Sequence, residues 1–305
     1  MERKISKLRN IKVTVFTPTF NRGYIIEKLY NSLKLQTSAE FEWVVVDDGS
    51  SDNTEELFKG WMNEDNFFSI NYVKVKNGGK HRAINRGVKL AKGKLFFIVD
   101  SDDYLTSDAI EKLLNWEASL PDKLHFAGVA GARGYSNSQM IGSGHGVEYI
   151  DCKNEEREKY GLRSDKAEAY YTEILKQFPF PEFENENFIT ESVVWNAISR
   201  AGYKIRWYDQ IIYIGEYRDD GLTADNMGLF MRNPKGHLLA LKSDFSLPSN
   251  SLKRKIAIIG MYYKVGKRLD MNTGVLASDL GVPQMLLILF GYMRDIIDRA
   301  RNTRN

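Results

Sequence analysis

Cysteine and histidine are scarce in this chain of 305 residues. Its single cysteine, Cys152, cannot form an intramolecular disulfide bond, and its four histidines show no spacing typical of a zinc site. A disulfide-stapled secreted fold and a zinc-binding module are therefore not expected. The sequence instead favours a reducing compartment, and we expect the protein to be cytoplasmic.

Long apolar runs and a large net charge are also missing. The longest apolar run, residues 282–293, is well short of the roughly 20 residues that a membrane-spanning helix needs. The basic, polar residues 1–10 do not resemble a secretory signal. A formal net charge of +3 is too small to favour nucleic acid as a partner. The hydrophobic content of 43% predicts a folded protein rather than a disordered or fibrous one.

Short β-rich runs alternate with helical patterns over the first hundred residues. This arrangement is typical of consecutive β-α-β units, whose right-handed crossovers build a parallel sheet. The sequence therefore predicts an α/β fold. We expect strands at residues 12–16, 43–47, 71–76 and 94–99, and helices at residues 24–36, 54–62 and 82–91.

The alternation weakens beyond residue 123. There we expect strands at residues 124–130, 205–208 and 211–214, a charged helical segment at residues 154–176, and a helix at residues 195–203. From about residue 251 the pattern is helical and basic. We predict a catalytic domain at residues 1–245, divided into halves at residues 11–105 and 106–245, and a helical appendage at residues 246–305.

Polar or glycine-rich segments follow all four predicted strands of the first half. In open parallel sheets, ligands bind beyond the carboxyl ends of the strands, so these segments should line one site. They are TPTFNR at residues 17–22, DDGSSD at residues 47–52, NGGKH at residues 77–81 and DSDD at residues 100–103.

The DSDD segment brings Asp100, Asp102 and Asp103 to the end of a buried strand. Three carboxylates in such a place require a counter-ion, and Mg²⁺ and Mn²⁺ prefer oxygen ligands, commonly one or two carboxylates plus phosphate oxygens. A metal here would neutralise a departing diphosphate. The alternative is that Asp102, Asp103 or Ser107 caps a helix that starts near Thr106.

The DDGSSD segment offers a second group of carboxylates. Asp47 or Asp48 could accept a hydrogen bond from the imide N–H of a uracil, and we assign Asp48 to the nucleotide. For Asp52 we favour the alternative, in which its side chain caps the helix that follows.

Taken together, these motifs resemble glycosyltransferase family 2. The matching segments, in order, are TPTFNR, SLKLQT at residues 32–37, DDGSSD, NRG at residues 85–87 with AKG at residues 91–93, and DSDD. The resemblance is close over residues 13–109 and looser to about residue 223. It implies the GT-A nucleotide-diphospho-sugar transferase fold, a Rossmann-like, mixed and mostly parallel sheet. It also implies inverting transfer from a nucleotide-diphosphate sugar, such as a UDP-sugar, in bacterial capsule, cell-wall or lipopolysaccharide synthesis.

The resemblance also implies roles for individual residues in the donor site. Asp102 would bind the metal, Mn²⁺ or Mg²⁺, and Asp100 would contact the ribose or the metal-bound shell. His81 could contact phosphate or simply begin a helix. The residues expected to bind the nucleotide-sugar are Thr17, Pro18, Asp48, Lys80, Asp100 and Ser101.

The catalytic base is expected at Glu191. Inverting transfer needs a carboxylate to take the proton of the acceptor hydroxyl. The family often carries a Glu-Asp pair for this role, but here Ser192 stands in place of the Asp. The alternative is that Thr190 caps a helix and that Glu191 stabilises its N-terminal end. A loop further on holds the reserve carboxylates and an arginine that could pair with phosphate: Glu216, Asp219, Asp220 and Arg218.

Two basic amphipathic helices are expected in the appendage, at residues 251–269 and 282–304. They could lie on an anionic membrane surface, pack on the catalytic domain, or join a second copy of the chain. Membrane contact would place the enzyme on the inner face of the cell membrane and would suit a lipid-linked saccharide acceptor, although a free saccharide is also possible.

Two other functions compete with sugar transfer. A sugar-1-phosphate nucleotidylyltransferase has a similar topology, but would carry a glycine-rich, basic loop after its first strand, which residues 17–22 lack. The other is a non-catalytic subunit that binds sugar nucleotides or docks at a membrane. This hypothesis stays open because Ser192 replaces the Asp of the family's Glu-Asp pair.

Overall fold

The computed structural model describes residues 10–121, 123–215 and 226–302. These residues fall into two compact units, which are treated separately below. The first contains the described residues up to Pro179 and those from Ile198 to 215, and the second contains Phe180–Ala197 and the described residues from 226 onward. The predicted boundary between residues 245 and 246 does not coincide with this division.

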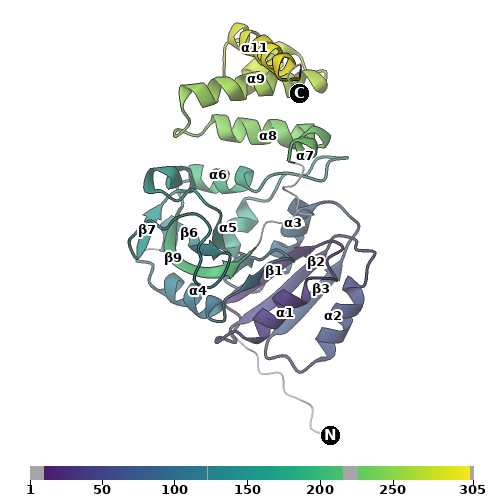
Figure 1. Ribbon diagram of the computed structural model, residues 1–305, viewed down its shortest axis with the longest axis vertical. Helices are drawn as coiled ribbons and strands as arrows, with labels where there is room; N and C mark the ends of the chain where they lie inside the picture. The colour runs from purple at the N-terminus through teal and green to yellow at the C-terminus, as the bar shows by residue number, and fades with distance from the viewer. Residues whose placement is uncertain (1–9, 122, 216–225, 303–305) are drawn as a thin grey trace. The chain divides into compact units, whose positions relative to one another are not determined.

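A nine-stranded sheet lies within the described part of the first unit, in the order β3-β2-β1-β4-β8-β6-β9-β5, with β7 also paired to β9 (Figure 1). Its first four strands are parallel, which confirms the predicted fold class. They and their crossover helices agree with the sequence prediction to within a few residues. They are β1 (Val13–Thr19), α1 (Glu27–Lys34), β2 (Phe41–Asp47), α2 (Thr54–Asn63), β3 (Ser69–Lys74), α3 (Lys80–Leu90) and β4 (Leu95–Ile98).

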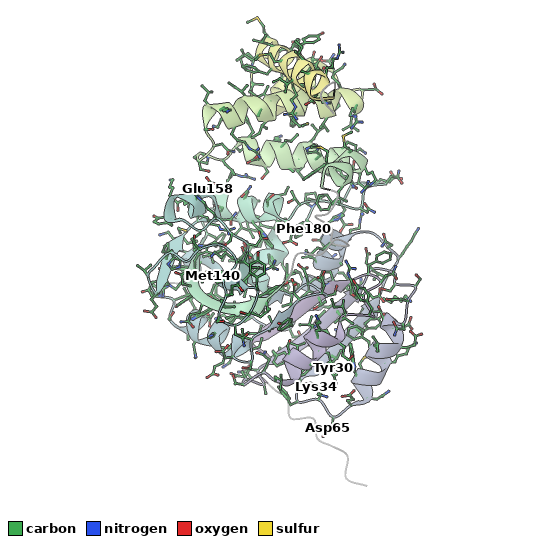
Figure 2. The ribbon with its side chains drawn as sticks, viewed as in Figure 1. Tyr30, Lys34, Asp65, Met140, Glu158 and Phe180 are labelled. Atoms are coloured by element: carbon green, nitrogen blue, oxygen red, sulfur yellow. The ribbon has the colours of Figure 1, made fainter. Side chains whose placement is uncertain are left out.

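These strands form because their side chains are buried on both faces of the sheet. The valines at residues 44–46 are fully buried, as is usual for a central parallel strand. Under β2, Trp43 joins an aromatic cluster in which Tyr30 stacks on Trp61 at a centroid distance of 4.4 Å. The ammonium of Lys34 lies 5.1 Å from the centroid of the Tyr30 ring, and Figure 2 labels both residues on α1. The cluster fixes α1 and α2 on one face of the sheet.

The second half of the sheet is mixed, because β8 runs antiparallel to both β4 and β6. Its strands are β5 (Tyr104–Leu105), β6 (Phe126–Gly134), β7 (Tyr149–Cys152), β8 (Lys166–Tyr171) and β9 (Lys204–Ile214). The two strands predicted at residues 205–208 and 211–214 form the single strand β9. The helical elements are α4 (Ala109–Ala118), η1 (Lys123–His125), η2 (Asn154–Tyr160) and α5 (Thr172–Gln177).

The prediction of one helical segment at residues 154–176 is wrong. This segment begins as the 3-10 helix η2, which ends at Gly161, a residue in the left-handed conformation with φ at +76°. It continues as the strand β8, and only α5 is α-helical. The sequence did not predict this strand because it contains charged residues such as Lys166 and Glu168. The strand is buried because it pairs with β4 and β6, which the composition of the segment does not indicate.

The second unit is helical. α8, α9 and α11 lie side by side (Figure 1) around an apolar core that includes Leu238, Tyr262, Leu276 and Leu287. Of the two helices predicted for the appendage, α9 and α11 match, whereas α7, α8 and α10 were not predicted. The helices are α6 (Ser192–Arg200), which begins in this unit, α7 (Asn226–Arg232), α8 (Pro234–Phe245), α9 (Leu252–Arg268), α10 (Thr273–Leu280) and α11 (Gln284–Asn302).

Among the described residues, no single helix is long and apolar enough to cross a membrane. α10 and most of α11 reach that standard only as a pair, and the pair is bent by 104° at the break between them.

Two helical glycines test how tightly the first unit is packed. A Cβ at Gly87 would lie 2.2 Å from the buried ring of Phe16, whereas a Cβ at the exposed Gly60 would meet nothing within 4 Å. We expect Gly87→Ala to lower the free energy of unfolding by about 1–3 kcal/mol through overpacking. Gly60→Ala should raise it by about 0.5–1 kcal/mol through helix propensity. Urea denaturation measures both, and equal effects would contradict the packing described.

Candidate functional site

Three of the polar loops singled out in the sequence meet at one edge of the sheet. The segments at residues 17–22 and 47–52 begin within the last residues of β1 and β2, and residues 100–103 follow β4. β1 pairs in parallel with both β2 and β4. The first two are joined directly, because the backbone N–H of Asn21 donates to the Ser50 hydroxyl at 2.8 Å. The structure therefore brings these loops together as predicted.

Asp48 joins the fourth loop to this edge. Its two carboxylate oxygens accept hydrogen bonds from the backbone N–H groups of Gly78 and Gly79, each at 2.8 Å. Burial raises the pKa of Asp48 above its ordinary value, against the lowering effect of these two hydrogen bonds. Gly79 is the N-cap of α3, with φ at +95°, so the carboxylate lies at the positive end of that helix. Asp48 thus positions the segment that leads into Lys80, and its nucleotide role stays a prediction.

The neighbouring acids have structural roles. Asp47 is fully buried and accepts hydrogen bonds from the Ser50 N–H, at 2.7 Å, and from the Tyr72 hydroxyl. Asp52 accepts from the N–H of Thr54 at 3.1 Å and from its hydroxyl at 2.6 Å. Asp52 therefore stabilises the start of α2, but it is not the predicted N-cap, because Asn53 holds that position.

Thr17 and Pro18 lie near the carboxyl end of β1, and both are buried. The Thr17 hydroxyl accepts a hydrogen bond from the Trp43 indole N–H at 3.0 Å. That contact ties the first loop to the core of the sheet. Direct contact of Thr17 or Pro18 with a nucleoside stays a prediction.

Asp100 lies between two cations from different parts of the chain. Lys80 Nζ, from the first residue of α3, is 2.6 Å from Asp100 Oδ1, and Arg133 Nη2, from β6, is 3.7 Å from Oδ2. Burial opposes ionisation of Asp100, but the positive charges of Lys80 and Arg133 hold its pKa below the ordinary value. Sequence reasoning selected Lys80 and Asp100. It missed Arg133, whose only signal was a lone charge in the small-residue strand FAGVAGARG.

A second acid, Asp103, is buried and is held by β9. Its Oδ2 accepts a hydrogen bond from the Tyr213 hydroxyl at 2.5 Å, and that hydroxyl accepts one from the Asp100 N–H at 3.0 Å. The Arg133 guanidinium carbon lies 3.9 Å from the centroid of the Tyr213 ring. Burial and the nearby Asp100 charge raise the pKa of Asp103 to about 7. The sequence did not indicate a role for Tyr213 either. The segment that forms β9 was predicted as two short strands.

Asp102 and Ser101 lie in the turn between these two acids, with Ser101 buried and Asp102 partly exposed. The helix-capping alternative for Asp102 and Asp103 is wrong, because α4 begins only at Ala109, after β5. Within the residues that the structure describes, no three His, Cys, Asp or Glu side chains gather as in a protein-only metal cage. A metal here would therefore need oxygen ligands from the substrate besides the protein.

The expected base, Glu191, belongs to the second unit. It precedes α6, and its backbone carbonyl accepts hydrogen bonds from the N–H groups of Val194 and Trp195 at 3.0 and 3.1 Å. Its catalytic role stays a prediction, as does a role for His81, which is buried in the first turn of α3. The reserve residues Glu216, Arg218, Asp219 and Asp220 lie outside the described residues.

The sequence matches one family over more than half of its length. The profile of Glycosyl transferase family 2 matches residues 14–177. The GalNAc(5)-diNAcBac-PP-undecaprenol beta-1,3-glucosyltransferase of Campylobacter jejuni is 27% identical over 219 residues, which are 70% of this chain and 67% of that protein. Across curated relatives, the matched stretch covers between 18% and 67% of the relative's own length. The similarity thus extends over only part of most of these proteins.

Solved structures resemble the fold over most of the chain. Residues 1–349 of Staphylococcus aureus TarS, in complex with UDP-GlcNAc, superpose with a TM-score of 0.59 at 18% identity, covering 92% of each chain. The mannosyltransferase PcManGT of Pyrobaculum calidifontis, in complex with GDP-Man and Mn²⁺, gives a TM-score of 0.52 at 17% identity, covering 92% of this chain and 86% of that one. At these identities the likeness supports the GT-A fold.

The Tyr213 hydroxyl provides a test of the network at this edge. We expect Tyr213→Phe to lower the free energy of unfolding by about 1–3 kcal/mol, because it leaves a buried carboxylate and a buried N–H without this partner. Tyr208→Phe is the matched control on the same strand, since the Tyr208 hydroxyl contacts Ser119 at 2.9 Å instead. Denaturation curves of the two variants should differ clearly. Equal stability would contradict the central position given to Tyr213.

Proposed function

Because this chain belongs to Glycosyl transferase family 2, as its match over residues 14–177 shows, we propose that it transfers a sugar from a UDP-sugar to an acceptor in bacterial surface-polysaccharide synthesis. One observation carries the proposal. The carboxyl ends of β1, β2 and β4 meet where Lys80 and Arg133 flank Asp100, two residues before the partly exposed Asp102. The family match does not favour a sugar-1-phosphate nucleotidylyltransferase.

The charges at this edge suit a diphosphate. Lys80 supplies a point charge, and Arg133 supplies a planar guanidinium that pairs well with phosphate oxygens. In the donor complex, these two cations would share their charge between Asp100 and the diphosphate. Asp48 would keep Gly78 and Gly79 in place, which aligns Lys80 at the start of α3. TarS, bound to UDP-GlcNAc, supports a UDP-sugar as donor.

We propose further that Asp102 binds Mn²⁺ or Mg²⁺. The residues fit such an ion only with help from the substrate: Asp102 is partly exposed, whereas Asp100 and Asp103 are engaged by Lys80, Arg133 and Tyr213. Both metals accept this arrangement, since they commonly take one or two carboxylates and complete their shell with phosphate oxygens. When bound, the ion would neutralise charge on the departing diphosphate. PcManGT, bound to GDP-Man and Mn²⁺, supports this choice.

The transfer is proposed to invert the configuration at the anomeric carbon of the donor sugar. Glu191 would take the proton from the acceptor hydroxyl as its oxygen attacks from the face opposite the leaving diphosphate. Ser192 follows in place of an Asp, so Glu191 would act without an acidic neighbour at that position.

The acceptor is proposed to be a saccharide, either free or linked to a lipid. The Campylobacter relative, whose name specifies an undecaprenol-linked saccharide, supports the lipid-linked case. Such an acceptor is held in a membrane. The enzyme would then be cytoplasmic and would work at the inner face of the cell membrane, through its C-terminal helices or as an assembly with a second copy.

Removing the Asp102 carboxylate tests the metal site. We expect Asp102→Asn to reduce Mn²⁺-dependent release of UDP from a UDP-sugar by about 10²–10³-fold, because one charge that stabilises the departing diphosphate is lost. The matched control is Asp65→Asn, at an exposed position beyond α2 that Figure 2 labels. It should keep full activity. Metal-dependent turnover that survives in Asp102→Asn would show that the ion binds elsewhere.

Glu191→Gln separates chemistry from donor binding. We expect sugar transfer to fall by about 10²–10⁴-fold, since the amide cannot accept the proton, while the Kd for UDP stays unchanged. Glu184→Gln alters an exposed acid in the preceding loop and serves as the control. Calorimetric titration of UDP and a transfer assay measure the two properties. Wild-type transfer by Glu191→Gln would assign the base to another residue.

A further inference from the structure

An exposed apolar stripe runs along α11. Its members recur at steps of three and four residues, which places them on one face of the helix. Leu287, by contrast, is fully buried in the core with α9 and α10. Isolated exposed apolar side chains are ordinary, but a contiguous row indicates a contact surface. The α11 stripe consists of Met285, Leu289, Tyr292, Met293, Ile296 and Ile297, which are between 45% and 77% exposed.

α9 packs against the face of α11 that lies opposite the stripe. The two helices approach closely, because a Cβ at Gly291 would lie 2.2 Å from the Tyr263 ring and a Cβ at Gly260 would lie 2.8 Å from a backbone oxygen of α11. The rings of Tyr263 and Tyr292 are 6.1 Å apart. Lys253 and Lys267 lie seven residues before and after Gly260, so they share this face of α9. Both lysines are exposed, and they lie on the helix that supports α11 from behind the stripe.

The charge of these helices is strongly one-sided. Residues 252–302 hold nine Lys or Arg and four Asp, a net charge of +5, although the whole chain carries only +3. α9 contributes six of the basic residues and no acidic one. A two-fold pairing of this surface with a second copy would bring like charges together. An exposed apolar and aromatic face on a strongly basic group of helices instead suits the interface of an anionic bilayer.

We propose that the α11 stripe docks on the surface of an anionic lipid bilayer, with α11 lying in the plane of the interface and the exposed lysines of α9 adding positive charge close to it. The stripe enters the boundary between headgroups and acyl chains, and Lys253 and Lys267 contact lipid phosphates. α11 spans roughly 28 Å along its axis, at about 1.5 Å per residue, so it can lie flat along most of its length. This inference does not require the proposed sugar transfer.

Vesicle flotation of the full chain tests the docking. The probes are vesicles of phosphatidylcholine alone and of phosphatidylcholine mixed with phosphatidylglycerol. We expect the protein to float with the mixed vesicles and much less with the neutral ones. High salt should weaken the association, because it screens the lysines. UDP release measured without vesicles reports on the proposed enzymatic function separately.

Two pairs of substitutions divide the surface into its apolar and charged parts. Leu289→Ser with Ile296→Ser should lower partitioning into mixed vesicles at least about tenfold, because two side chains lose their apolar burial. Lys253→Gln with Lys267→Gln should reduce the preference for phosphatidylglycerol. Leu35→Ser, which alters a side chain 70% exposed after α1, is the matched control and should float like wild type.

Three outcomes would overturn the proposal, provided that circular dichroism shows folded protein. The wild-type chain could stay in solution with mixed vesicles. The double serine variant could float as well as the Leu35→Ser control. The wild-type chain could sediment as a dimer that the same serine substitutions dissociate, which would assign the α11 stripe to a second copy.

Discussion

The need to neutralise Asp100 organises the sheet edge on which the rest of the site depends. A carboxylate at the end of a buried strand is costly without cations close by. Lys80 meets this need from α3 and Arg133 from β6, so one charge links the parallel half of the sheet to the mixed half. Tyr213 adds β9 to the same network through Asp103 and the Asp100 N–H. Four segments distant in sequence are thereby held at one place.

The same arrangement explains why this edge suits diphosphate chemistry. Lys80 and Arg133 already face an anion, so a bound diphosphate would enter an environment whose positive charge is in position beforehand. Asp48 helps to fix the position of Lys80, because its carboxylate accepts hydrogen bonds from the N–H groups of the two glycines that precede this lysine. Asp102 is partly exposed and, unlike Asp100 and Asp103, takes no part in these contacts, which leaves its carboxylate suited to a metal shared with the substrate.

The parallel half could be predicted from sequence because its signals are local. The apolar runs at β1, β2 and β4 and the polar segments after them lie within single β-α-β units, and they identified Lys80, Asp48 and Asp100. Arg133 and Tyr213 could not be found in this way, since their importance arises from pairing across distant strands. β8 was mistaken for helix for the same reason: its charged residues give no period of two, and its burial comes from β4 and β6. The buried residues of α8 and α10 pack against neighbouring helices. The periodicity of these two segments was too weak to predict them as helices.

A panel of nucleotide sugars tests whether this sheet edge holds and activates a nucleotide-diphosphate donor. The purified chain would be incubated with UDP-, GDP- and dTDP-sugars in the presence of Mn²⁺ or Mg²⁺, and the release of free nucleoside diphosphate would be measured. The account predicts slow release of UDP from at least one UDP-sugar, with little or none from the other nucleotides. A folded chain that neither releases a nucleoside diphosphate from any donor nor binds UDP would contradict it.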